Sequence, residues 1–150
     1  MPFDEASLPK DWFMREEELP TAVQNGFTIG AHTVNHPILT HESDEVVRRE
    51  VTESKQVPET LTGMPVRHFA YPNGDHNEQV VRCVEEAGYA TAVTTQAGWN
   101  TVGSDVYRLL RFDVHETMCI DHRGRFSEAV FALYLAGEWG RISQKWRLLR

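Results

Sequence analysis

The sequence predicts an α/β fold in which short strands alternate with helices around a parallel sheet. Short apolar runs that end at glycine or proline recur along the chain and are typical of strands. Amphipathic segments with helical periodicity lie between them. Strands that alternate with helices form right-handed β-α-β units, which build a parallel sheet. With 150 residues, of which 41% are hydrophobic, residues 1–150 are expected to form one domain with one core.

The first half of the chain predicts two helices around a strand. Residues 15–25 are expected to form a short helix, and residues 27–31 form an apolar strand. Ser43 has the character of an N-cap, and the helix that follows is expected to run to about Leu61. Pro58 falls inside this helix and is expected to kink it or to end it early, because proline lacks an N–H group.

The second half repeats the alternation. Residues 66–71 form an apolar strand, and Asp75 with Glu78 has the spacing of a capping box that opens a helix ending at Gly88. The elements expected after this helix are, in order, a strand (89–94), a twelve-residue loop (95–106), a strand (108–115), an apolar helix (126–136) and a basic terminal helix with Ile142, Trp146 and Leu149 on one face. A loop of that length inside a compact domain is often functional.

Composition excludes several classes of function. The net charge is −7, so the surface repels nucleic acid phosphates, and no nucleic acid partner is expected. No apolar run reaches the roughly 18 residues of a transmembrane helix. The polar first ten residues do not resemble a signal peptide, and the chain as it stands is expected to be cytoplasmic. Cys83 and Cys119 lack metal-binding spacing and are expected to be buried or free thiols.

Two histidines follow the strand at residues 27–31. His32 and His36 are four residues apart, so a tight loop or one helical turn can bring both to one ion. Neutral imidazole nitrogens suit zinc and other divalent first-row metals. Pro37 disfavours helical geometry at His36, which predicts a short turn. The alternative is a pair of loop histidines that only hydrogen-bond to nearby backbone groups.

A second motif ends the strand at residues 66–71. It reads Phe69-Ala70-Tyr71-Pro72-Asn73-Gly74, an apolar strand that runs into a proline-glycine turn. Together with the segment from His32 to His36, it resembles the polysaccharide deacetylase family, the NodB-homology domains of carbohydrate esterase family 4. In that family a His-Ser/Thr-x-x-His motif supplies two of three metal ligands, and an aromatic-Pro-x-Gly turn forms one wall of the sugar groove. The resemblance extends from about Phe13 to Val114, in the family's order.

One motif of the family is absent from the sequence. The family's first strand ends in Thr-Phe-Asp-Asp, whose first Asp is the general base and whose second Asp is the third metal ligand. The two Phe-Asp pairs here, at Phe3 and Phe112, lack a preceding apolar strand. The arginine of the family's third motif aligns with Ala70. The resemblance therefore implies the C-terminal two-thirds of a distorted (β/α) barrel that lacks its first strand or strands.

The resemblance also implies substrate and acid residues. Tyr71 and Pro72 are expected to line the sugar groove, and the alternative is a purely structural turn. Trp99 in the long loop is expected either to stack on a sugar ring or to plug the loop with its indole. The family's last motif supplies a histidine that protonates the leaving amine. His115 is the nearest candidate by position, although its surroundings do not match the usual Leu-x-His pattern.

The expected function is a metal-dependent hydrolase that removes N-acetyl groups from an N-acetylated polysaccharide or glycan, with zinc as the first choice of metal. Two alternatives remain open because Thr-Phe-Asp-Asp is absent. One is an inactive remnant that binds carbohydrate or a partner chain, and the other is a subunit whose Asp pair comes from another polypeptide. A barrel without its first strand leaves the strands at residues 27–31 and 108–115 without a full set of neighbours, so self-association through this open edge is also expected.

Overall fold

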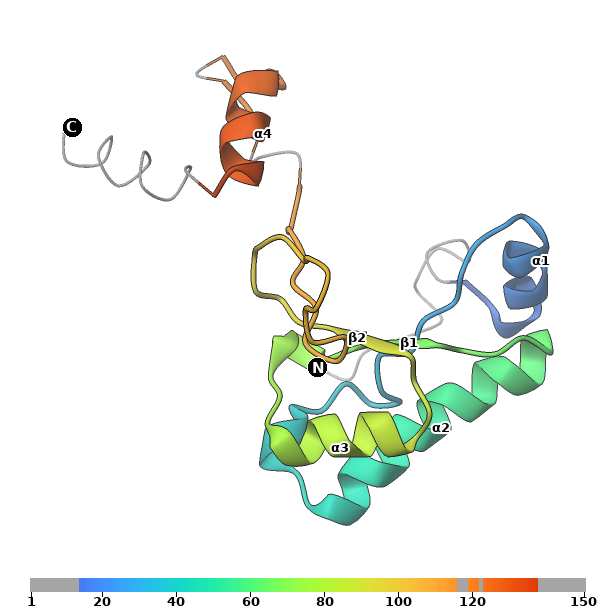
Figure 1. The fold of residues 1–150 in the computed structure, drawn as a ribbon. Helices are drawn as coiled ribbons and strands as arrows, with labels where there is room; N and C mark the ends of the chain where they lie inside the picture. Colours follow the sequence, from blue (N-terminus) through green and yellow to red (C-terminus); the bar gives the residue numbers. More distant parts are fainter. Residues whose placement is uncertain (1–13, 116–118, 122, 138–150) are drawn as a thin grey trace, which may run out of the picture.

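The computed structural model describes residues 14–115, 119–121 and 123–137. The chain is a mixed α/β structure, as the sequence predicts (Figure 1). Its elements are, in order, η2 (Glu16–Glu18), α1 (Leu19–Gln24), η3 (Leu39–His41), α2 (Asp44–Thr62), β1 (His68–Ala70), η4 (Pro72–Gly74), α3 (Glu78–Glu86), β2 (Thr91–Val93) and α4 (Glu128–Leu135). The predicted basic helix near Ile142 lies outside the described residues. Within the described part of the chain, no helix is long and apolar enough to span a membrane.

The sheet is parallel but small. Strand β1 pairs with β2 in a parallel register that places Phe69 opposite Ala92. Single parallel bridges extend this order on both sides, from Ala31 to β1 and from Leu109 to β2. The predicted strands at residues 27–31 and 108–115 are therefore reduced to one bridging residue each. The described residues form two paired strands with one further bridge at each edge, and a closed barrel is not observed among them.

Helices α2 and α3 lie on the same side of the sheet (Figure 1). Phe69 and Ala92 point from the strands into this layer and are buried. The other buried apolar residues of the core are Ala31, Leu39, Val47, Val51, Val66, Tyr71, Val80, Val81, Cys83, Val84 and Tyr89. On the opposite face of the sheet, His68 is exposed and bonds through Nδ1 to Oγ1 of Thr91 at 2.9 Å. The core therefore lies between the sheet and the two helices.

Helix α2 begins and ends as predicted, within one residue of Leu61. The Oγ of Ser43 accepts a hydrogen bond from Val46 N at 3.5 Å, and Gly63 closes the helix with φ of 68°. The prediction that Pro58 would end the helix early is wrong, because the helix continues to Thr62, and a kink at Pro58 stays a prediction. The last turn is tied down from outside the backbone ladder, since the Glu59 carboxylate accepts a hydrogen bond from Val66 N at 2.8 Å.

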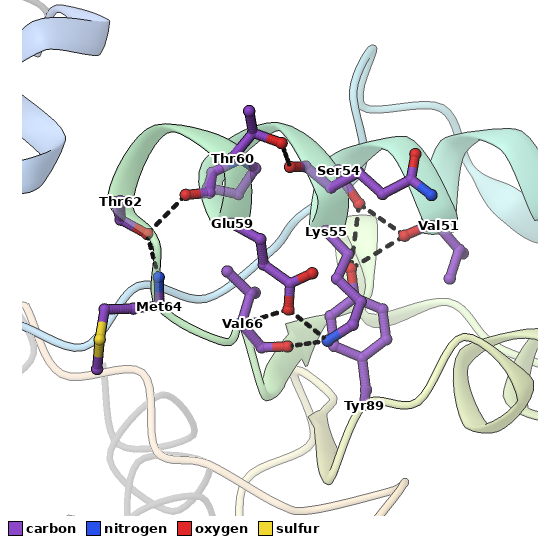
Figure 2. A network of polar contacts seen from close by, with 11 residues as sticks. Val51, Ser54, Lys55, Glu59, Thr60, Thr62, Met64, Val66 and Tyr89 are labelled. Atoms are coloured by element: carbon purple, nitrogen blue, oxygen red, sulfur yellow. Dashed lines mark hydrogen bonds and ion pairs between the residues drawn. The ribbon is translucent and has the colours of Figure 1, made fainter.

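A polar network joins this half of α2 to the chain entering β1 (Figure 2). The Nζ of Lys55 donates to the carbonyl of Val66, lies 3.0 Å from a carboxylate oxygen of Glu59, and sits 4.9 Å from the centre of the Tyr89 ring. The hydroxyl of Tyr89 donates to the carbonyl of Val51 at 3.0 Å. These contacts fix the chain that enters β1 on the helix layer.

The other helix boundaries follow local capping. Helix α3 is capped by Asn77, whose Oδ1 accepts a hydrogen bond from Val80 N at 2.9 Å. The predicted capping box at Asp75 is therefore wrong by two residues. Helix α4 starts after Ser127, within the predicted range 126–136. Cys83 and Cys119 are buried free thiols, as predicted.

Candidate metal centre at the carboxyl ends of the strands

His32 directly follows Ala31, the residue that bridges to β1, and so lies at a strand end as the sequence predicts. Ala31 N donates to the His68 carbonyl at 2.8 Å, and Ala70 N donates to the Ala31 carbonyl at 2.9 Å. The next residue, His32, places its ring Nδ1 2.7 Å from the carbonyl oxygen of Ala70. Because a carbonyl only accepts hydrogen bonds, Nδ1 carries the proton, and Nε2 of the neutral ring keeps its lone pair.

His36 is folded back onto His32 by a tight, non-helical loop. The two ring centres are 4.7 Å apart and the ring planes are inclined by 75°. The Oγ1 of Thr33 accepts a hydrogen bond from His36 N at 3.0 Å. Thr33 has φ of 64° and His36 has φ of 55°, in the left-handed region that L-residues seldom occupy. The predicted short turn is confirmed, and its backbone is strained.

A buried carboxylate that sequence reasoning missed holds this loop. Glu50 on α2 is only 2% exposed. Its Oε2 accepts hydrogen bonds from Val34 N at 2.8 Å and Asn35 N at 2.9 Å, and its Oε1 accepts one from Asn35 Nδ2 at 2.6 Å. The sequence signal was a charged residue on the apolar stripe of α2, between Val47 and Val51.

The cost of the strained backbone in the histidine loop and the stabilisation from its hydrogen bonds to Glu50 are of comparable size. Two residues in the left-handed region cost roughly 1–3 kcal/mol each. Hydrogen bonds to a charged group contribute roughly 1.5–3 kcal/mol each, and Glu50 accepts three. Burial alone would raise the pKa of Glu50, but the hydrogen bonds from Asn35 and Val34 lower it below its ordinary value. An ionised Glu50 can therefore offset the strain of the loop.

The histidine pair fits part of a metal site. A proton fixed on one ring nitrogen by a backbone carbonyl is the usual support of a metal-binding histidine, and His32 has it through Ala70. Two neighbouring imidazoles suit zinc and related divalent ions. In the described part of the chain, no group of three His, Cys, Asp or Glu side chains could hold a metal ion. The described residues thus offer two candidate ligands, His32 and His36.

The two predicted groove residues are in the core. Tyr71 is 0% exposed, and its hydroxyl donates to the Tyr107 carbonyl at 2.9 Å. Pro72 is also fully buried. Burial raises the pKa of the Tyr71 phenol, so the side chain stays neutral. Their role as a sugar-groove wall stays a prediction, and burial counts against it, because neither side chain presents a surface to a ligand in this structure.

Trp99 and His115 lie apart from the helix layer, in the segments that follow β2. The indole of Trp99 is 66% exposed, but its Nε1 donates to the Leu135 carbonyl at 2.8 Å. Its ring meets Phe112 edge-on and lines a mainly apolar pocket of about 360 Å³ beside α4. These contacts agree with a plug, and sugar stacking stays a prediction. His115 is exposed in the irregular segment after Leu109, and its role as acid stays a prediction.

Comparison with known proteins identifies the family. The model of the polysaccharide deacetylase family matches residues 7–92. The protein YxkH of Bacillus subtilis is 26% identical over 117 residues, which are 78% of this chain and 42% of that protein. A peptidoglycan-N-acetylglucosamine deacetylase of Bacillus cereus is 32% identical over 71 residues, 47% of this chain and 33% of the relative.

A solved structure agrees with the sequence relatives. The deacetylase PplD of Streptococcus pyogenes, solved in complex with acetate, aligns with a TM-score of 0.67 and 26% identity, over 70% of this chain and 46% of PplD. This chain therefore spans less than half the length of each of these relatives. The family match covers more than half of the chain and includes the loop that carries both histidines. The chain belongs to the polysaccharide deacetylase family.

Proposed function

We propose that this chain forms the histidine side of a metal-dependent deacetylase centre that acts on an N-acetylated polysaccharide. The observation that carries the proposal is the hydrogen bond from His32 Nδ1 to the Ala70 carbonyl beside His36. This arrangement orients one imidazole with its second nitrogen available to a ligand. Family membership supports a carbohydrate substrate. The barrel of the family is proposed for the whole domain, and its four-position parallel order is the part supported here.

The chain's own residues have limited roles in this proposal. His32 and His36 hold the ion, and the strand ends set where the ion lies. A bound divalent cation supplies an activated water and polarises the acetyl carbonyl. Zinc is the proposed metal because two neutral imidazoles suit it. The third ligand and the general base are not assigned to a residue, because the sequence contains no Thr-Phe-Asp-Asp motif.

Metal titration tests the proposal. Isothermal calorimetry with zinc is expected to show binding by the wild-type chain. His32→Ala and His36→Ala are expected to weaken it by more than about tenfold, the smallest effect typical of losing even a supporting residue. His41→Ala is the matched control, because His41 is exposed and lies on η3 outside the loop. Equal zinc binding by all four proteins would show that the pair is not the site.

The second candidate function is a carbohydrate-binding domain without catalysis. It is favoured by the absence of Thr-Phe-Asp-Asp from the sequence. The isolated chain is expected to release acetate from N-acetylglucosamine oligomers at background level, because a general base typically contributes about 10²–10⁴-fold to the rate. Acetate release well above a metal-free control would contradict this, and would show that a carboxylate such as Asp113 serves as base.

Self-association is proposed as a partner interaction. In residues 27–30, the backbone makes no strand-pairing hydrogen bond to another described residue, and Ala31 is the first residue of this segment that makes one. Phe27 is 68% exposed next to this edge. An extended segment with free backbone groups and an exposed aromatic side chain can pair with a second copy. This edge is the surface proposed for self-association.

A further inference from the structure

The unusual feature of α2 is a carboxylate buried on its apolar face. Glu50 lies between Val47 and Val51, at a position where the helix packs on the core. Among the described residues, no lysine or arginine forms a salt bridge with Glu50. Both of its oxygens accept hydrogen bonds from the loop at residues 34–35. Its buried charge is therefore compensated mainly by this loop, with a smaller contribution from the charge of Arg49.

The hydrogen bonds within the loop at residues 33–36 do not attach it to the rest of the fold. The contacts of Thr33 Oγ1 with His36 N and with the His32 carbonyl are local, and they leave the loop free to move as a unit. The left-handed φ angles of Thr33 and His36 oppose the observed conformation. Glu50 joins the loop to a rigid helix sixteen residues away from Val34 in the sequence. It does so through backbone N–H groups, so it fixes the path of the chain between the two histidines.

We propose that Glu50 is a positioning residue that holds the loop at residues 33–36 in the conformation in which His32 and His36 face one ligand. Glu50 does not touch the substrate and is not itself a ligand, because both oxygens are committed to the loop. Its effect on metal affinity rests on the proposed function. Its effect on the order of the loop does not, and can be measured in the metal-free chain.

Three variants separate this role from general damage to the core. Glu50→Leu keeps most of the buried volume but cannot accept hydrogen bonds. Glu50→Gln keeps one acceptor oxygen for the two backbone N–H groups. The double variant Glu50→Gln/Asn35→Asp exchanges donor and acceptor across the 2.6 Å side-chain contact, whereas Asn35→Asp alone sets two carboxylates against each other. The same Leu and Gln substitutions at the exposed Glu53, one turn further along α2, are the controls.

Amide hydrogen exchange of the metal-free chain is the first measurement. In Glu50→Leu, the N–H groups of Val34 and Asn35 are expected to exchange at least about tenfold faster, because each loses a hydrogen bond to a charged group. Glu50→Gln is expected to be intermediate, Asn35→Asp to be fast, and the double variant to return toward the wild-type rates. Core amides of α2 and the Glu53 variants are expected to keep wild-type rates.

Zinc titration is the second measurement, with an expected loss of affinity of about 10–100-fold in Glu50→Leu and partial recovery in the double variant. Unchanged exchange at Val34 and Asn35 in a cooperatively folded Glu50→Leu chain would overturn the inference. So would a double variant no better than Asn35→Asp. If Glu50→Leu does not fold, Glu50→Gln and the double variant decide. If the wild-type chain binds no zinc, the proposed function fails, and the exchange rates alone decide the role of Glu50.

Discussion

The turn after β1 offers a sharp test of how closely the chain packs at the carboxyl ends of the strands. Gly74 has φ of +80°, and a Cβ built on it would lie 2.1 Å from Thr95 Oγ1 and 2.7 Å from Thr95 N. Thr95 follows β2, and its Oγ1 donates to the Asn73 carbonyl at 3.1 Å. The two strand ends therefore meet at a point where only glycine fits.

The cost of Gly74→Ala has two parts. A left-handed backbone costs an L-residue about 1–2 kcal/mol. Overpacking costs typically about 1–3 kcal/mol more. The hydroxyl of Thr95 can rotate away, but its backbone nitrogen cannot, so the second part cannot be relieved by a rotamer change. The sum predicts that Gly74→Ala lowers the free energy of unfolding by about 2–5 kcal/mol.

Gly88 supplies a matched control, because its φ is +78° and no atom lies within 4 Å of a Cβ built there. Gly88→Ala is expected to lose only the backbone part, about 1–2 kcal/mol. Urea unfolding followed by circular dichroism measures the free energy of unfolding of both variants, which can be compared if their m-values agree. If Gly74→Ala is no less stable than Gly88→Ala, the close approach to Thr95 does not exist and the reasoning is refuted.

Three further predictions concern other parts of the molecule. Burial raises the pKa of Tyr89 to about 12, so its stabilising contribution is complete below pH 10 and is lost as the pH rises to about 12. Over this window, wild type should lose about 2–3 kcal/mol more than Tyr89→Phe, which still carries the buried Tyr71. Equal losses in stability curves across alkaline pH would contradict this. Lys55→Met should lower the free energy of unfolding in urea by about 1–3 kcal/mol, because the Val66 carbonyl loses its donor and Glu59 loses its ion pair. Arg48→Met, which breaks an exposed ion pair, should lower it by less than about 1 kcal/mol. Similar losses in the two variants would argue against the network. Light scattering at micromolar concentration should give a mass above the 17.2 kDa of one chain, and a folded monomer would count against self-association.

Local signals in the sequence determined the helices and the position of the histidine loop. Ser43 and Gly63 mark the two ends of α2 because capping depends on a side-chain oxygen and on a left-handed backbone, both local properties. The spacing of His32 and His36 and the proline that follows predicted a tight turn at a strand end. The parallel arrangement followed from the alternation of helices and strands.

Only the tertiary structure decided the rest, because it depends on contacts between residues far apart in the chain. Pro58 lies inside α2, whose last turn is held by the hydrogen bond from Val66 N to the Glu59 carboxylate. Tyr71 can be buried because its hydroxyl donates a hydrogen bond to the carbonyl of Tyr107, a residue far along the chain. The pattern of apolar residues shows that Glu50 is a charged residue on the buried face of α2, but it does not identify the groups that Glu50 contacts. Its three hydrogen-bond donors, from Val34 and Asn35, lie on a loop that precedes it in the sequence and meets it only when α2 packs on the sheet.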